Sequence, residues 1–326
     1  MNNSTFANEP QAYRKSGTFI FVIFLECVGL FLAVTLNCCH LIVLTSNTSL
    51  FTGNLRLCLR LLAVFDVFGG VICYGIQIFF YFEPSIIRNS MRICNLAAGA
   101  SAMFVLFSQS ILFVITIDRY IAVTRPLKYY NILSQKKVRF LLLLAIIMAA
   151  SLSLGRSIHG ARIGHCDFKG PQLFGQRVMA IYQMTPLFLV IAATFLNLQV
   201  LRIAYAHKKR DKIARTSAMA LLSRDTTDAR HADGNTFSER CKTAITISAV
   251  VGASYVVWTP YLLITMIIIA TNWHFFPLGM ILMYWFLYAS FWLNPLVFGL
   301  ASMKYRNAIV RLIRRTTSQS IDSNRY

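Results

Sequence analysis

SAMFVLFSQSILFVITIDRY, residues 101–120, is an apolar run long enough to cross a membrane, and it ends on the charged pair Asp118-Arg119. A basic stretch from Arg125 to Arg139 follows at once. An Asp or Arg at the centre of a membrane helix costs roughly 2.5–3.5 kcal/mol, and less near the interface. The pair therefore either lies at the surface, with side chains that reach out to water, or has a function inside the protein. Apolar runs that carry single polar residues recur along the chain, which favours a function.

The composition is that of a membrane protein. Hydrophobic residues make up 56% of the 326 and charged residues only 13%, whereas soluble domains have about 25% charged residues. Seven apolar windows are long enough to span about 30 Å of hydrocarbon, at about 18–44, 55–81, 92–123, 138–158, 178–206, 241–271 and 278–301. The third, fifth and sixth run past the bilayer, as helices that project into the cytosol would. No internal repeat supports a transporter, and the polar first 17 residues do not resemble a signal peptide.

The positive charge predicts the orientation of the chain. With the N-terminus outside, 24 of the 32 Lys and Arg residues lie on the cytosolic side and 8 on the outer side. Such a bias predicts an extracellular N-terminus and a cytoplasmic C-terminus in a multi-pass membrane protein. We therefore interpret the net charge of +20 as an orientation signal and a docking surface for acidic lipid or an acidic partner, and we expect no binding of nucleic acid.

Two features of the outer side indicate modification. Asn2 and Asn3 begin overlapping glycosylation acceptor triplets in the outer tail, whereas the triplet at Asn47 lies in the first cytosolic loop and should stay unmodified. Cys94 opens the third window on the outer side, and Cys166 lies in the second outer loop. Both face the oxidising compartment, so a disulfide between them is chemically allowed.

Seven apolar helices with Asp118-Arg119-Tyr120 at the end of the third resemble the rhodopsin-like (class A) G-protein-coupled receptors. The resemblance covers about residues 18–314. Each marker alone is weak, and their order and spacing together are specific: Asn37, Leu62-Ala63-x-x-Asp66, Cys94 at 25 residues before Arg119 as in the family's disulfide, Pro186, Trp258-Thr259-Pro260 and Asn294-Pro295-Leu296-Val297-Phe298. The resemblance implies an all-α membrane protein, a seven-transmembrane helix bundle over 18–301. A tail over 1–17 precedes it, and 302–326 hold a short amphipathic eighth helix, Lys304 to Arg315, and a cytoplasmic tail.

The resemblance also implies a switch at the cytosolic end. Arg119 would meet the tail of a heterotrimeric G protein when the sixth helix swings outward about its kink at Pro260, and Asp118 would hold Arg119 at rest. The family often adds a carboxylate from the sixth helix. The nearest one here is Glu239, and because Arg240 follows it we expect a weak resting lock. A static kink at Pro260 is the alternative. The remaining switch residues are Tyr120, Trp258, Asn294, Pro295 and Phe298.

Asp66 is an ionisable group deep in a membrane span, which by itself suggests a functional site. Ser108 lies 11 residues, about three helical turns, before Arg119 and therefore at the depth of Asp66. With Ser290 and Asn294 these side chains would form a sodium pocket like that of the family, since a cation would offset the buried carboxylate. The alternative is a protonated or water-bonded Asp66 without an ion. No other cofactor or metal is predicted.

Glu26 is the main local indication of a ligand. It precedes Asn37 by 11 residues, so both lie on the inward face of the first helix, and we predict a hydrogen bond from Glu26 to Tyr288. A protonated Glu26, or one that reaches the outer headgroups, is the alternative. The predicted ligand cavity is lined by Glu26, Ser101, Val105, Phe168, Trp258, Thr265 and Tyr288.

Several ligand classes are disfavoured by single residues. Tyr288 stands where light sensors have the retinal lysine, Ser101 where amine receptors have an aspartate, and Thr265 where nucleoside receptors have an asparagine. Phe168 and Glu26 do resemble the nucleoside receptors. An extracellular small molecule or a short peptide therefore stays open.

Other departures from the family pattern concern the switch. Phe298 and Thr194 replace tyrosines, and Gln109 and Ser254 replace an apolar pair below the ligand. We predict a receptor without catalytic chemistry, which converts binding of an extracellular ligand into activation of a heterotrimeric G protein. The alternatives are a receptor-like decoy that does not signal and a channel or transporter.

Overall fold

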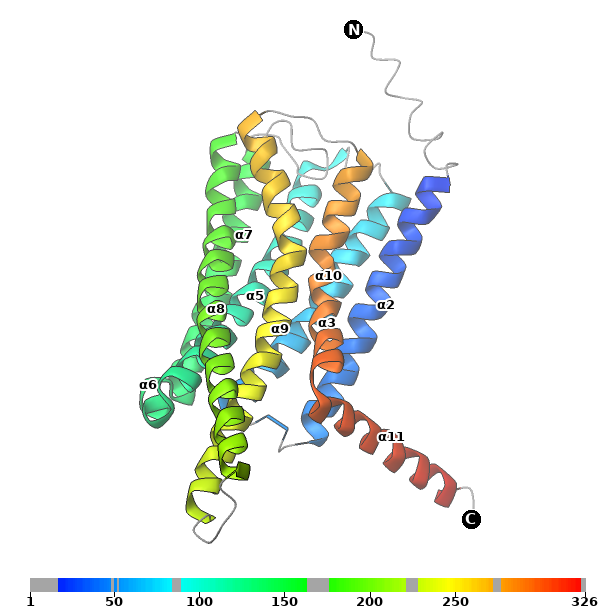
Figure 1. The fold of residues 1–326 in the computed structure, drawn as a ribbon. Coiled ribbons are helices and arrows are strands. Elements are labelled where there is room, and N and C mark those ends of the chain that lie inside the picture. The colour runs from blue at the N-terminus through cyan, green and yellow to red at the C-terminus, as the bar shows by residue number, and fades with distance from the viewer. Residues whose placement is uncertain are drawn as a thin grey trace.

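The computed structural model describes residues 17–47, 50–51, 53–83, 89–162, 176–220, 228–271 and 277–323. Every regular element among these residues is a helix, as predicted. Seven long helices run side by side as a bundle, and α11 leaves one end of it at a steep angle (Figure 1). The bundle helices are α2 (Gly17–Ser46), α3 (Gly53–Phe82), α5 (Met91–Thr124), α7 (Gln135–Arg162), α8 (Gln176–Ala220), α9 (Asp228–Thr271) and α10 (Pro277–Ala301). The short helices η1 (Pro126–Lys128) and α6 (Tyr129–Ile132) lie between α5 and α7.

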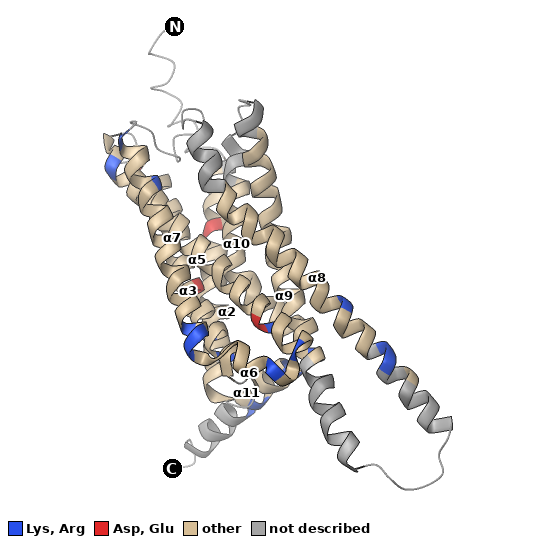
Figure 2. Cartoon of the chain, turned by 90° about the vertical axis from the view of Figure 1, so that its left-hand side faces the viewer, with Lys and Arg blue, Asp and Glu red and all other residues tan. Residues whose placement is uncertain are grey.

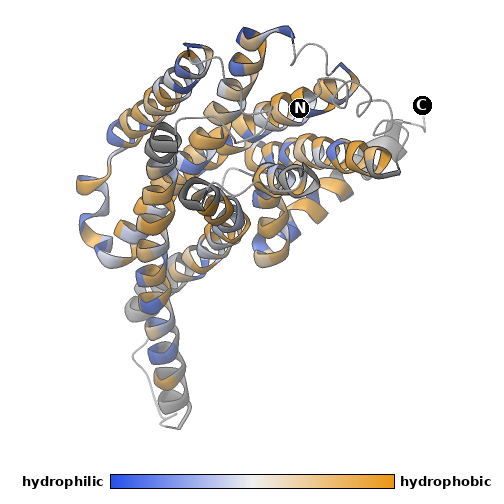
Figure 3. Ribbon diagram, turned by 90° about the horizontal axis from the view of Figure 1, so that it is seen from above, coloured by the Kyte–Doolittle hydropathy of each residue, from blue (hydrophilic) through white to orange (hydrophobic). Residues whose placement is uncertain are grey.

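The length and composition of the helices fit a membrane. Six helices of the described chain are long and apolar enough to cross one, and the sharply bent pair α10 and α11 adds a seventh candidate. The predicted extension of the third, fifth and sixth windows is confirmed, because α5, α8 and α9 have 34, 45 and 44 residues. Many large apolar side chains along the bundle are exposed, which suits contact with lipid. Hydrophobic residues predominate along the bundle helices (Figure 3).

The predicted eighth helix is α11 (Met303–Ser323), which is longer than the stretch expected. It bends by 95° from the axis of α10. Met303, Val310 and Ile313 are exposed, whereas Tyr305 and Ala308 pack against the bundle core. The helix therefore has two apolar faces, one for the bundle and one that is open to a membrane surface.

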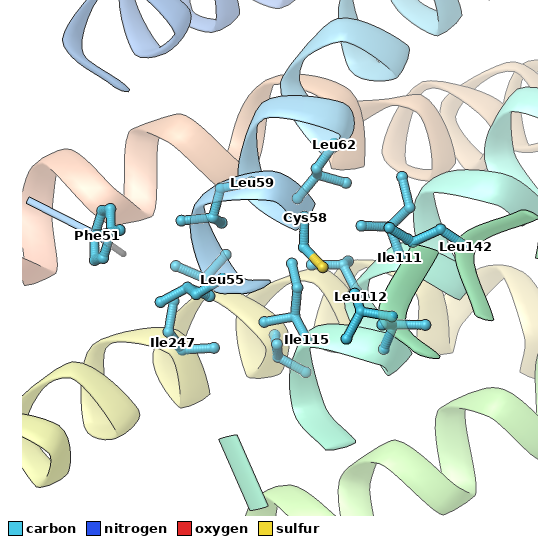
Figure 4. Packing of buried hydrophobic residues seen from close by; sticks show 14 of the residues in the cluster. Phe51, Leu55, Cys58, Leu59, Leu62, Ile111, Leu112, Ile115, Leu142 and Ile247 are labelled. Atoms are coloured by element: carbon cyan, nitrogen blue, oxygen red, sulfur yellow. The ribbon is translucent and has the colours of Figure 1, made fainter. Parts of the chain in front are cut away.

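Leucine and isoleucine side chains fill the end of the bundle that lies near α6 and α11 (Figure 4). Leu55, Leu59 and Leu62 of α3 lie one or two turns apart and share one face of that helix, opposite Ile111 and Ile115 of α5. Further members of the cluster come from α7, α9 and α10. Most of the basic residues of the described chain lie toward this end, and a few lie at the opposite end (Figure 2).

The prolines within α8, α9 and α10 have no backbone N–H, so each leaves a carbonyl oxygen of its helix without the usual donor. For the proline of α10, the structure shows which group replaces that donor. Pro295 lacks the N–H that would bond to the carbonyl oxygen of Phe291, four residues earlier. Asn37 Nδ2 of α2 donates to this oxygen at 2.7 Å and to Ala33 O at 2.8 Å. The asparagine side chain thus satisfies a carbonyl that the proline exposes, and it joins α2 to α10.

Glycines allow the helices to approach closely around α3. A methyl group at Gly69 would lie 2.5 Å from the ring of Phe291, which is fully buried. A methyl group at Gly29 of α2 would lie equally close to the ring of Tyr74. The rings of Phe291 and Tyr74 therefore occupy the space that the absent side chains leave.

We expect Gly69→Ala to destabilise the protein by about 1–3 kcal/mol, because the buried Phe291 ring has no room to move away. Gly75→Ala is the matched control, since it lies in the same helix with nothing within 4 Å of the added methyl group. The control should be neutral or slightly stabilising. Thermal unfolding of the purified protein measures both, and equal midpoints for the two variants would contradict the packing described.

Candidate functional site

A chain of hydrogen bonds crosses the centre of the bundle through Asp66, which is fully buried. Its Oδ1 accepts from the Ser108 hydroxyl at 2.7 Å, and its Oδ2 accepts from Asn294 Nδ2 at 2.8 Å. The Ser254 hydroxyl in turn donates to Asn294 Oδ1 at 2.7 Å. The Asp66 network, formed by Asp66, Ser108, Asn294 and Ser254, therefore connects α3, α5, α10 and α9.

Three of the four predicted sodium ligands meet in this network, and Ser290 does not. The Ser290 hydroxyl donates to the carbonyl oxygen of Leu287 at 2.8 Å, within its own helix. Ser254 was noted in the sequence only as a departure from an apolar residue. Ser254 lies one helical turn before Trp258, and this spacing could have predicted that its side chain is on the inward face of α9.

Gln109 is the second polar residue at the predicted apolar pair. Its side chain is buried, and neither its amide nitrogen nor its amide oxygen has a hydrogen-bond partner. Ser254 therefore forms part of the Asp66 network, whereas the Gln109 side chain forms no hydrogen bond.

The second polar site lies at the C-terminal end of α5 and is centred on Asp118. Asp118 Oδ2 accepts hydrogen bonds from Nε of Arg119 at 2.9 Å and from its Nη2. Its Oδ1 accepts from the hydroxyl of Tyr129 at 2.5 Å. Asn54 Nδ2 donates to the same hydroxyl and to Leu133 O, at 3.2 and 2.9 Å. The Asp118 cluster, formed by Asp118, Arg119, Tyr129 and Asn54, thus joins α5 to α6 and α3.

Burial, together with the neighbouring Asp118 carboxylate, raises the pKa of the Tyr129 hydroxyl, so Tyr129 keeps the proton that it donates. Tyr129 and Asn54 were not predicted as site residues. Tyr120, which was predicted, packs against Val123, Val200 and Ala244 between α5, α8 and α9. The side chains of Glu239 and Arg240 lie outside the described residues.

Phe298 belongs to an aromatic cluster where α10 meets α11. The rings of His40 and Phe298 stack with centroids 5.1 Å apart, and His40 Nδ1 lies 2.8 Å from the hydroxyl oxygen of Tyr305. The Tyr305 ring is 6.1 Å from that of Phe298. A phenol hydroxyl is therefore present here on α11 rather than at residue 298, and it joins α11 to α2. Neither His40 nor Tyr305 was predicted as a site residue from the sequence.

The predicted ligand residues on α2, α5, α9 and α10 are buried: Glu26, Ser101, Val105, Trp258, Thr265 and Tyr288. The Thr265 hydroxyl donates to Tyr261 O at 2.6 Å, within its own helix. Buried polar atoms without a hydrogen-bond partner include Glu26 Oε2, Ser101 Oγ and Trp258 Nε1. Phe168 lies outside the described residues.

The predicted hydrogen bond between Glu26 and Tyr288 is wrong, since the described structure contains none between these residues and leaves Glu26 Oε2 without a partner. Tyr74 explains the difference. Its ring packs directly on Gly29, one turn after Glu26, and meets the ring of Tyr288 edge-on at 5.8 Å. Trp292 Nε1 donates to the Tyr74 hydroxyl at 3.2 Å and holds the ring in this position.

Cys94 is buried and disulfide-bonded. Cys166, the predicted partner, lies outside the described residues, as do the glycosylation candidates Asn2 and Asn3. The pairing and the glycans therefore stay predictions.

We expect Ser254→Ala to destabilise the protein by about 1–3 kcal/mol, because it leaves the buried Asn294 Oδ1 without its donor. Ser153→Ala is the control, since the Ser153 hydroxyl is also buried but has no partner to lose. The control should be neutral or stabilising. Thermal unfolding of both variants checks this, and a larger loss in Ser153→Ala than in Ser254→Ala would contradict the network.

Comparison with known proteins assigns the chain to a family. Residues 19–298 match the model of the 7 transmembrane receptor (rhodopsin family). One relative is a rhodopsin from Camponotus atriceps, 26% identical over 229 residues, which are 66% of this chain and 58% of the relative. A second is probable G-protein coupled receptor 21 from Homo sapiens, 21% identical over 267 residues, which are 78% of this chain and 72% of the relative. The match to the Camponotus atriceps rhodopsin thus spans little more than half of that protein. With the matched model covering all seven bundle helices, the chain belongs to the rhodopsin family of seven-transmembrane receptors.

Proposed function

We propose that this receptor lies in the plasma membrane, binds an extracellular ligand and activates a heterotrimeric G protein through movement of α9. The N-terminus would lie outside and the C-terminus inside, as the distribution of Lys and Arg along the chain indicates. The ligand would be a small molecule or a short peptide. The protein itself would carry no catalytic chemistry, in keeping with the general character of the family.

The Asp118 cluster is the observation that carries this proposal. Asp118 is fully buried, and each of its carboxylate oxygens accepts a hydrogen bond, one from Arg119 and one from Tyr129. A buried carboxylate holds a charged partner strongly, and it costs free energy when that partner leaves. Arg119 is therefore held in a resting position that a G protein must release in order to contact it.

The connection between the ligand side and this cluster would run along α9. Pro260 interrupts the hydrogen bonding of that helix near Trp258, and Ser254 ties the same helix to Asn294 one turn further along. A ligand that favours the conformation without the Ser254 hydrogen bond would shift the receptor toward it, since a ligand acts only through its different affinity for two states. The movement would then uncover Arg119.

We also propose that the Asp66 network binds a sodium ion. Asp66 and Ser108 supply carboxylate and hydroxyl oxygens in one buried place, which are ligands that a hard cation accepts. Asn294, whose Nδ2 donates to Asp66, would have to turn its amide oxygen toward the ion to act as a further ligand. An ion there would also compensate the charge of a buried carboxylate. Asp66 with its two hydrogen bonds and no ion is the competing state.

A non-signalling receptor is the second candidate, and Phe298 favours it. The seventh-helix motif has lost its hydroxyl at this residue, and the Phe298 ring stacks on His40 and neighbours Tyr305. A receptor whose seventh helix is fixed in this way would bind a ligand without changing its conformation. Nucleotide exchange on several G-protein classes, measured at matched surface expression, separates the two candidates.

We expect Arg119→Ala to keep surface expression and to lower G-protein activation by at least about fivefold, since coupling free energies are typically 1–3 kcal/mol. Arg125→Ala is the control, because this exposed arginine follows α5 at the same end and should change activation little. Basal and ligand-stimulated nucleotide exchange measure both. If Arg119→Ala signals like the parent, the receptor does not use this residue.

We expect sodium chloride to raise the unfolding midpoint above that in potassium chloride at equal ionic strength, because an ion bound only by the folded state stabilises it. Asp66→Asn should abolish the difference, since it removes the charge that attracts the ion. The same midpoint in both salts for the parent, or the same sodium effect in Asp66→Asn, would refute the sodium site.

A further inference from the structure

We propose that the aromatic residues next to Glu26 bind a positively charged amine or ammonium group, and that Glu26 is its counter-ion. The inference rests on the proposed receptor function, because it names the class of ligand for that receptor. It assigns the counter-ion to α2, whereas amine receptors have it on the helix that carries Ser101 here.

Glu26 is 1% exposed, and its Oε2 has no hydrogen-bond partner. In the part of the chain that the structure describes it forms no ion pair. Among the described residues, the groups that interact with it electrostatically include Cys73, Tyr74 and Tyr288, none of which carries a positive charge. A buried carboxylate without a partner is costly, and the partner that would compensate it best is a cation.

Two aromatic rings, Tyr74 of α3 and Tyr288 of α10, lie beside this carboxylate, and further rings of α10 and α9 continue the aromatic cluster away from it. Tyr74 and Tyr288 have centroids 5.8 Å apart, Tyr288 and Tyr284 6.1 Å, and Tyr284 and Tyr261 6.2 Å. Trp258 continues the cluster at 6.2 Å from Tyr261. The faces of such rings attract a cation within about 6 Å of the centroid, and aromatic cages of this kind recognise ammonium groups. An anionic ligand would be repelled by both the rings and the carboxylate.

A structural role for Glu26 finds little support in the contacts around it. Trp285 Nε1 of α10 donates to the carbonyl oxygen of the preceding residue, Leu25, at 2.9 Å, so the link between α2 and α10 is made by the backbone at this level. Further along, Asn37 joins the same two helices. Glu26 adds no hydrogen bond to either link.

Two further buried polar groups suggest a second feature of the ligand. Ser101 Oγ on α5 and Trp258 Nε1 on α9 also lack hydrogen-bond partners. A hydroxyl or carbonyl group elsewhere on the ligand would satisfy them. Tyr74, Tyr261 and Tyr288 are buried, so we expect at least one of these rings to rotate as a ligand enters.

The test uses choline, tetramethylammonium and 2-phenylethylamine as probes, with 3,3-dimethylbutan-1-ol as the neutral isostere of choline. Thermal unfolding of the full-length receptor is measured in nanodiscs of neutral lipid at constant sodium and ionic strength. At least one cation should raise the midpoint by about 2–4 °C at saturation, and the neutral isostere should not. The proposal is overturned if no cation shifts the midpoint or if the isostere shifts it as much as choline.

Glu26→Gln should abolish the shift and should leave the midpoint without ligand unchanged or higher, because it removes an unpaired buried acid. Glu83→Gln, at the exposed end of α3, is the matched control and should keep the shift. A shift that survives in Glu26→Gln, or a fall in its midpoint without ligand, overturns the proposal.

Tyr284→Leu removes one ring of the aromatic cluster but no charge, so it tests the cage independently of Glu26. It should weaken cation binding, and an undiminished shift would count against the cage. Arg119→Ala should keep the cation shift whatever it does to signalling. Failure of the cation site and failure of G-protein coupling are therefore observed separately.

Discussion

Polar groups within membrane-spanning helices must find partners inside the protein, because the surrounding hydrocarbon offers none. Pro295 exposes the carbonyl of Phe291, and Asn37 of a different helix satisfies it. Asp66 and Asn294 are likewise satisfied only by side chains from other helices. Each of these bonds has one good geometry, so together they fix the positions of α2, α3, α5 and α10 more narrowly than leucine packing does.

The same constraint explains how the bundle accommodates its departures from the family pattern. Ser254 replaces an apolar residue and bonds to Asn294, which adds α9 to the Asp66 network. Phe298 lacks a hydroxyl, and Tyr305 provides one nearby that meets His40. Both departures are thus accompanied by a polar contact between helices, of Ser254 with Asn294 and of Tyr305 with His40.

The helices and the meeting of Ser108 with Asp66 were predictable, because hydropathy and helical periodicity depend on the sequence alone. The partner of Glu26 was predicted wrongly, since the ring of Tyr74, held over Gly29, lies beside Tyr288 and leaves the acid unpaired. Contacts such as these depend on how neighbouring helices are rotated and how closely they approach. No periodicity within one helix contains that information.

We propose that the Ser254–Asn294 hydrogen bond holds α9 at rest, that the Asp118 cluster of α5, α6 and α3 holds Arg119, and that release of both lets α9 swing. The most direct measurement is the distance between spin labels at the exposed residues Lys136 of α7 and Lys242 of α9, introduced as non-canonical amino acids. One main distance is expected in the parent, and a second, longer one when Ser254→Ala is combined with Asp118→Asn. An unchanged distance distribution in that double variant would contradict it.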